Sequence, residues 1–82
     1  MRASPSKAGN VKELSLIDQV KLEDAWFELR KAETLEKLGR RAMAQQVLVN
    51  ALYLANRLPR WFTDEQWKLQ YDKLHRKLYT GI

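Results

Sequence analysis

The chain has 82 residues, no cysteine and a formal net charge of +5. A chain of this size buries only about 60% of the surface that its unfolded form exposes, so we expect one domain at most, with a thin core. Because the chain has no cysteine, it cannot form disulfides, a thiolate nucleophile or a zinc cluster built on thiolates. It also has no run of about eighteen apolar residues, so the sequence does not predict a membrane span. We therefore expect a small cytoplasmic protein that is held together by packing alone and does not enter a membrane.

The first twelve residues are basic and contain little that a core would bury. Arg2, Lys7 and Lys12 occur there without any acid. Such a segment predicts a flexible basic arm over residues 1–12, followed by a single helical domain over residues 13–82.

The apolar spacing predicts a first helix from about Leu16 to Leu38. Ser15 is a typical N-cap residue, and Asp18 follows it by three positions. Apolar residues then recur every three or four positions, as on one face of an amphipathic helix: Leu22, Ala25, Trp26, Leu29, Ala32, Leu35 and Leu38. Gly39 predicts the end of this helix, because glycine readily adopts the left-handed conformation.

A second helix is predicted after this turn. Its stripe consists of Ala44, Val47, Leu48, Ala51, Leu52, Ala55 and Leu58. No charged residue occurs from Ala42 to Asn56, which favours burial on more than one face, and we expect Val49 and Tyr53 to contact a third helix. Pro59 predicts the end of the segment, since proline disfavours helix at the preceding residue.

A third helix is predicted to begin between Phe62 and Trp67. In this interpretation Thr63 is the N-cap and Gln66 completes a capping box, while Phe62 and Trp67 form a hydrophobic staple. The stripe continues with Tyr71, Leu74 and Leu78. The predicted fold is therefore all-α: a small three-helix bundle, made of a helical hairpin plus a third capped helix, with a flexible N-terminal arm.

The first two predicted helices resemble the helical pair of a tetratricopeptide repeat. The resemblance rests on the small residues, turn glycine and leucines at Ala32, Leu35, Gly39, Ala44, Leu48 and Ala51. The chain departs from that family at Lys31, where the family prefers a large apolar residue, and at Trp26, which is displaced from the usual tryptophan position. No second unit follows. We interpret the likeness as a property of any tight helical hairpin and transfer no functional residue.

Catalytic chemistry finds no support in the residue types. His75 is the only histidine, and the serines Ser4, Ser6 and Ser15 lie in the arm or at a helix cap, so no nucleophile with an evident base can be assembled. The three glycines are isolated and match no phosphate-binding loop. We expect no enzymatic activity, no cofactor and no metal site.

Two functional hypotheses remain. The first is a protein-binding module, such as a regulator, adaptor or inhibitor, which uses an aromatic and basic surface against a protein with an acidic surface, or against a second copy in a homodimer. Tyr, Trp and Arg dominate interface hot spots, because they bury a large area and keep a polar or charged end. The predicted partner-binding residues are Arg57, Arg60, Trp61, Phe62, Lys68, Tyr71, Arg76, Lys77 and Tyr79. Trp61 is as consistent with a core residue as with an interface residue.

The second hypothesis is nucleic-acid binding through a basic helix face. Basic side chains bind phosphates by displacing counterions. The predicted contacts are Arg40, Arg41, Arg57, Arg60, Lys73, Arg76 and Lys77. The second helix is too apolar to present a polar reading face to the major groove, so we expect contact without base-sequence preference.

Overall fold

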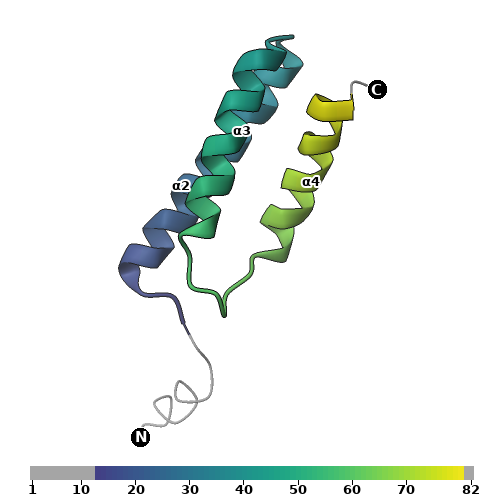
Figure 1. Cartoon of the computed structure of the whole chain (residues 1–82). Helices are drawn as coiled ribbons and strands as arrows, with labels where there is room; N and C mark the ends of the chain where they lie inside the picture. Colours follow the sequence, from purple (N-terminus) through teal and green to yellow (C-terminus); the bar gives the residue numbers. More distant parts are fainter. Residues whose placement is uncertain (1–12, 81–82) are drawn as a thin grey trace, which may run out of the picture.

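The computed structural model describes residues 13–80 and shows an all-α fold (Figure 1). Helix α2 spans Leu16–Lys37, α3 spans Arg41–Asn56 and α4 spans Glu65–Thr80. No strand occurs within the described residues. The predicted three-helix architecture is confirmed, with α2 and α3 as the hairpin. The arm predicted for residues 1–12 lies outside the described part of the chain.

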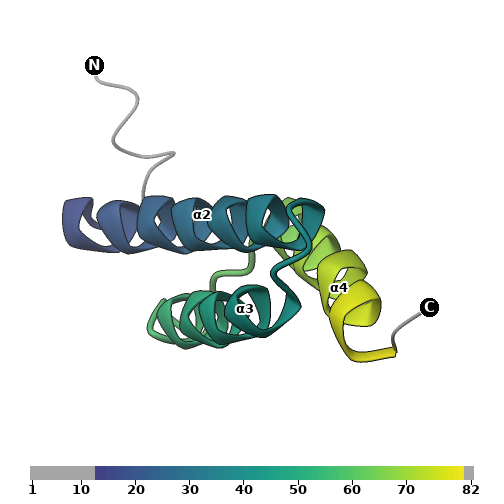
Figure 2. The same cartoon turned by 90° about the horizontal axis from the view of Figure 1, so that it is seen from above.

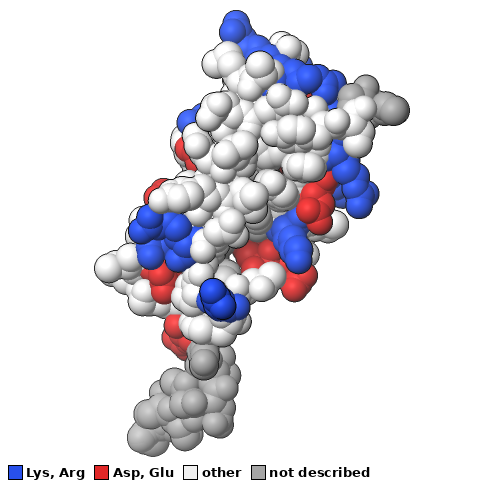
Figure 3. Space-filling view, viewed as in Figure 1, with Lys and Arg blue, Asp and Glu red and all other residues white. Residues whose placement is uncertain are grey.

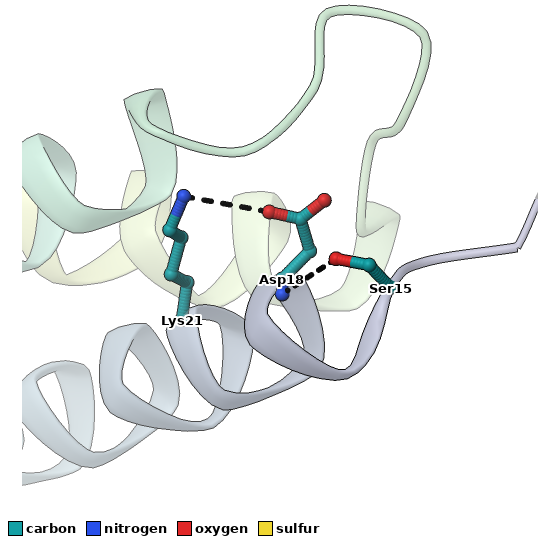
Figure 4. A network of polar contacts seen from close by, with 3 residues as sticks. All are labelled: Ser15, Asp18 and Lys21. Atoms are coloured by element: carbon teal, nitrogen blue, oxygen red, sulfur yellow. Dashed lines mark hydrogen bonds and ion pairs between the residues drawn. The ribbon is translucent and has the colours of Figure 1, made fainter.

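Helix α2 begins at the predicted cap. The Oγ atom of Ser15 accepts a hydrogen bond from the backbone N–H of Asp18 at 3.1 Å, and the Asp18 carboxylate lies 3.5 Å from the Lys21 ammonium (Figure 4). A carboxylate in the first turn also stabilises the helix, because its negative charge lies near the positive end of the helix dipole. The local sequence is therefore sufficient to begin this helix.

Helix α2 ends in a glycine turn. Gly39 has φ = 80°, in the left-handed region that favours glycine. Its N–H donates to the carbonyl of Glu36, and the N–H of Arg40 donates to the carbonyl of Leu35, which together form a Schellman motif. These two bonds supply donors to carbonyls that would otherwise have no hydrogen-bond partner at the helix end. After the turn the chain reverses direction into α3.

Alanines allow α2 and α3 to pack closely. The two helices lie side by side (Figure 2), and they contact one another far more extensively than either contacts α4. Their shared interface consists of fully or almost fully buried residues: Ala25, Leu29, Ala32, Ala44, Leu48 and Ala51. Because alanine carries only a methyl group, the two backbones approach closely while the leucines fill the remaining space.

Helix α4 closes the core from one side of the hairpin. It contributes the buried residues Trp67, Leu74 and Leu78. Within residues 13–80 no polar or charged side chain is buried. None of the helices in this part of the chain combines the length and apolar composition needed to cross a bilayer.

The start of α4 is capped by Asp64, so the predicted cap at Thr63 is wrong by one residue. Asp64 Oδ1 accepts from the backbone N–H of Trp67 at 3.1 Å, and Asp64 Oδ2 accepts from the indole of Trp26 on α2 at 3.0 Å. The indole of Trp67 in turn donates to the carbonyl of Ala25 at 3.0 Å. Aspartate is a better N-cap than threonine, and the Trp26 contact adds a second reason for its choice.

The far end of α4 is held by the first turns of α3. One guanidinium nitrogen of Arg41 donates to the carbonyls of Lys77 and Leu78, both at 3.0 Å. The amide of Gln45 donates to the same Leu78 carbonyl at 2.9 Å. A cation at the C-terminal end of a helix also neutralises the negative end of its dipole. Helix α4 is thus attached to the hairpin at both ends.

The outer face of α3 does not contact α4, contrary to expectation. Val49 and Tyr53 are 54% and 59% exposed. The side of α3 that meets α4 carries Gln45 and Leu52 instead. A stripe in the sequence predicts which residues share a face, but not how far the helix is rotated toward its neighbour.

Candidate functional site

The predicted partner-binding residues divide into two groups at opposite ends of α4. Arg57, Arg60, Trp61 and Phe62 lie before the helix, in or next to the connector, whereas Arg76, Lys77 and Tyr79 lie in its last two turns. Helix α4 has 16 residues, so about 24 Å separate its two ends. Tyr71 and Lys68 lie between the groups. The predicted set is therefore an extended surface and not one compact patch.

The connector group contains two aromatic clusters. One Arg57 guanidinium nitrogen donates to the Tyr53 hydroxyl at 3.0 Å, and the guanidinium lies 5.7 Å from the centre of the Tyr53 ring. Trp61 and Phe62 meet edge to face, with their ring centres 6.1 Å apart. Trp61 is 45% exposed and Phe62 is half-buried. Trp61 thus lies at the surface, while a large part of its ring is still covered.

Four rings stack along one side of α4, each four residues after the last. Ring centres are 5.2 Å apart between Trp67 and Tyr71, 5.7 Å between Tyr71 and His75, and 4.4 Å between His75 and Tyr79. We call this row the ring ladder. It begins in the core at Trp67, which is 6% exposed, and ends at Tyr79, which is 50% exposed. The ladder therefore carries aromatic surface continuously from the interior to solvent.

The position of Tyr71 in the ladder, partly covered by its neighbours, changes its pKa. The pKa of Tyr71 is raised above its ordinary value of 10.0, chiefly because burial removes water from the phenolate, and secondarily because Tyr79 and Asp72 add negative charge nearby. Tyr71 therefore stays neutral to a higher pH than a solvated tyrosine would.

A groove of about 280 Å³ lies between α3 and α4, next to the ladder. On α3 it is lined by Leu52, Ala55 and Asn56, and its α4 side includes Trp67 and Tyr71. Thr63, Asp64, Lys68 and Asp72 complete its wall. Leu52 is 37% exposed, so the groove joins the open surface of α3 to the ring ladder.

We define the α3/α4 face as this groove together with the exposed residues on either side of it. Its members outside the groove wall are Val49, Tyr53, His75 and Tyr79. Figure 3 shows that the surface over α3 is broadly uncharged in the view of Figure 1, with charged side chains gathered toward its margins. Nothing from Ala42 to Asn56 carries a charge, yet the outer side of that segment is open to solvent.

The basic residues also form two separate groups. Arg40 and Arg41 at the α2–α3 turn lie at the same end of the molecule as the last turns of α4 (Figure 1), which hold Lys73, Arg76 and Lys77. Arg57 and Arg60 lie at the opposite end. The predicted nucleic-acid contacts therefore do not line one continuous stripe, and the Arg41 guanidinium is bound to two carbonyls of α4.

The wall between α2 and α4 has mixed charge. A groove of about 330 Å³ there is lined by Glu33, Glu36, Lys37, Lys73 and Lys77, with Gln70 and Leu74. Acids and lysines alternate in this wall, which is typical of a solvated surface. Among the described residues, no three His, Asp or Glu side chains lie close enough together to hold a metal ion.

Sequence reasoning missed the residues that attach α4 and part of the apolar face. The bonds from Arg41 and Gln45 to α4, and from Trp26 to Asp64, join residues more than thirty positions apart. No local pattern marks such pairs. The absence of charge in α3 was the available signal for the α3/α4 face, but it was interpreted as burial.

No family model, curated protein or solved structure matches this chain. The face must therefore be judged by its own geometry and chemistry.

Proposed function

We propose that this chain is a non-catalytic binding module, acting as a regulator, adaptor or inhibitor, which docks onto another protein through the α3/α4 face. The observation that carries the proposal is the open, charge-free side of α3, where Val49 and Tyr53 are more than half exposed. Burying charge at an interface is costly, so interface centres are depleted of charged residues. A helix that avoids charge on its solvent side is suited to being covered.

The composition of the face supports the same proposal. Tyr53, Tyr71 and Tyr79 present aromatic rings, and Arg57 lies against one of them. Aromatic and arginine side chains are enriched among the residues that carry most of the binding energy in protein interfaces, because they bury large areas and keep a polar or charged end. Of the residues predicted from the sequence, Arg57, Tyr71 and Tyr79 belong to this face or its edge, and Trp61 and Phe62 border it through the connector.

The proposal is tested by capture of partners with matched variants. We expect Val49→Ser with Tyr53→Ser to retain the helical circular dichroism and melting temperature of the parent chain, while losing the proteins that the parent captures from its host. The control is Leu16→Ser with Phe27→Ser, which removes one aliphatic and one aromatic side chain that are 76% and 63% exposed on α2. Mass spectrometry of the three captures compares them directly.

Each outcome has a defined meaning. Loss of the same proteins from the Val49 and Tyr53 variant alone supports the α3/α4 face. Loss from the Leu16 and Phe27 variant alone assigns docking to α2 and contradicts the proposal. A parent chain that captures nothing specific, or that turns over a metabolite unaided, also contradicts it.

Nucleic-acid binding is a second candidate function, favoured by the gathering of Arg40, Arg41, Arg76 and Lys77 at one end of the molecule. Binding of this type weakens with salt, by a slope of about 0.9 in log affinity per phosphate neutralised. We expect Arg76→Ser with Lys77→Ser to lower that slope by about two if the candidate holds. A duplex that does not bind at low salt excludes it. The expected cytoplasmic location remains a prediction for either function.

A further inference from the structure

Arginines lie beyond both ends of the α3 side of the α3/α4 face. Arg41 and Arg57 flank α3, and Arg60 follows in the connector. The segment between the first two contains no charge, and α3 is about 24 Å long. On the α4 side of the groove, Lys68 and Asp72 lie one turn apart and have opposite charges. The α3 side of the face is therefore uncharged between arginines at its two ends, while the α4 side of the groove carries Asp64, Lys68 and Asp72.

We infer that the docking element of the partner is an amphipathic helix of about 16 residues, with an apolar stripe in the middle and acidic residues at both ends. This inference rests on the proposed function and specifies its partner. An apolar groove between two helices accepts a third helix through anchors at i, i+3 or i+4, and i+7. A helix of that length places its terminal acids about 24 Å apart, which matches the separation of Arg41 and Arg57 along α3.

Charge argues against a second copy of this chain as the occupant. A twofold dimer through the α3/α4 face can pack α3 against α3 of the second copy. Since arginines flank both ends of α3, that arrangement brings like charges together at each end. Like-charge pairing across an interface costs several kcal/mol and suppresses the wrong partner. A partner with acids at both ends removes this repulsion and adds attraction.

The same distribution argues against a nucleic acid on this face. A duplex carries about one negative charge per 1.7 Å of axis, so a nucleic-acid site needs cations along its whole length. The centre of the α3/α4 face offers Val49, Leu52 and Tyr53 instead. Covering phosphates with these side chains would remove water without supplying a counter-charge.

A displayed peptide library tests the inference on the full chain. Each 16-residue peptide has leucine or isoleucine fixed along one helical stripe, while the first three and last three positions vary among Glu, Lys and Ser. We expect Glu to be enriched at both ends of the selected peptides, and the best of them to bind at least tenfold more tightly than its Lys-ended counterpart. Equal recovery of Lys-ended peptides, or no enrichment, overturns the inference.

Charge reversal supplies the directional test. In the variant Arg57→Glu with Arg60→Glu, both altered residues are exposed, and we expect selection to switch from Glu to Lys at one peptide end only. The end that switches also shows whether the partner helix runs parallel or antiparallel to α3. The milder pair Arg57→Ser with Arg60→Ser keeps the test valid if the reversed chain does not fold, since Glu should then lose its enrichment at that end. An unchanged selection overturns the inference.

Two further measurements separate failure of the inference from failure of the proposed function. Selected peptides that lose binding to the Val49→Ser, Tyr53→Ser variant but show no preference for Glu at their ends would support docking through the α3/α4 face. They would contradict the inference that the partner helix has acidic ends. If the selected peptides bind that variant as tightly as the parent, the face itself is wrong. Competition of a selected peptide by anionic lipid vesicles or by duplex DNA, or a dimer of the free chain that Tyr53→Ser dissolves, overturns the acidic helix as the occupant.

Discussion

Asp64 joins two helices through a single carboxylate. One oxygen accepts the backbone N–H of Trp67 and so caps α4, while the other accepts the indole N–H of Trp26 on α2. A charged acceptor makes both bonds stronger than neutral ones would be. The residue therefore determines where α4 begins and also where that beginning lies on the hairpin.

Substitutions of Asp64 should distinguish the contribution of its capping oxygen to stability from the contribution of its negative charge. We expect Asp64→Ala to lower the free energy of unfolding by about 1 to 3 kcal/mol, because it removes an N-cap and leaves an indole donor without its acceptor. Asp64→Asn keeps a capping oxygen and should cost less. Thr63→Ala should change stability by less than about 0.5 kcal/mol. Urea denaturation compares the three variants, and a Thr63→Ala loss as large as that of Asp64→Ala would contradict the observed cap.

Tyr71 predicts a dependence of stability on alkaline pH. Its pKa is raised in the folded chain, by burial first and by Tyr79 and Asp72 next, so above about pH 10 the folded state binds more protons than the unfolded state. The resulting stabilisation is complete below the unfolded pKa and is lost as pH rises through the folded pKa. Tyr71→Phe lacks this titration. We expect the free energy of unfolding of Tyr71→Phe to improve relative to the parent between pH 9 and 11.5.

Chemical denaturation at several pH values measures that difference, and the exposed Tyr53 offers a matched control as Tyr53→Phe. A gap between parent and Tyr71→Phe that stays constant across this range would contradict the burial of the phenol.

At the scale of the element, the start and end of α2 and the start of α4 each have an identifiable cause. Ser15 begins α2, Gly39 ends it, and both were predicted from the sequence because a cap and a glycine turn depend on a few neighbouring residues. The start of α4 was predicted one residue early. Thr63 and Asp64 are both N-cap residue types, so the local sequence offered two neighbouring candidates. The bond from the Trp26 indole to Asp64, between residues 38 positions apart, is a contact that no local pattern marks.

The candidate site shows the same division. The ring ladder follows from residues spaced by four on one helix. Tyr71 was predicted in the apolar stripe and also as a partner-binding residue, and Tyr79 as a partner-binding residue. Val49 and Tyr53 were expected to contact α4, but they are more than half exposed, and Gln45 and Leu52 lie on the side of α3 that meets α4. Periodicity alone does not contain the rotation of α3 toward α4.

The turn between α2 and α3 should require glycine. Gly39 has φ = 80°, and no atom lies within 4 Å of where a Cβ would be. The cost of Gly39→Ala is therefore conformational and not steric, and we expect a loss of about 1 kcal/mol in the free energy of unfolding. Gly39→Asn should lose less, since asparagine tolerates the left-handed region. Thermal denaturation ranks the two variants, and an unchanged or raised melting temperature for Gly39→Ala would contradict this account.

The hydrogen bonds from Arg41 and Gln45 should stabilise the last turn of α4 locally. We expect Arg41→Ala with Gln45→Ala to speed amide hydrogen exchange in the last turn of α4, around Lys77 to Tyr79, because three bonds to the carbonyls of that turn are lost. Exchange in the middle of α2 should stay unchanged. Arg41→Lys keeps the charge and serves as the control. Uniform acceleration throughout the chain would show instead that these bonds support the whole fold.

For the whole molecule, α4 completes a core that the hairpin alone leaves open. The buried side chains of α4 are Trp67, Leu74 and Leu78, and Trp67 also bonds to the backbone of α2. Domains of this size have only about 5 to 15 kcal/mol of stability in total. The burial that α4 contributes is therefore expected to be a large fraction of the total stability.

Trp67 tests this dependence. We expect Trp67→Ala to cost about 3 to 5 kcal/mol, enough to lower the melting temperature by roughly 12 °C or more, because it removes core volume and the bond to Ala25. Trp67→Phe keeps an aromatic ring but loses the donor, and should cost about 1 to 3 kcal/mol. Calorimetry measures both. A Trp67→Ala chain that melts within a few degrees of the parent would show that the hairpin is stable without this anchor.

The order of the elements along the chain has a consequence for how the protein is made. The hairpin is finished when Asn56 is added, but its buried leucines wait for Trp67 and Leu78, which a ribosome supplies one to several seconds later at about 5 to 20 residues per second. During that interval the hairpin lacks α4. It then has apolar surface on two sides: the side that α4 later covers and the exposed side of α3. Exposed apolar surface of this kind favours association with other chains until α4 is in place.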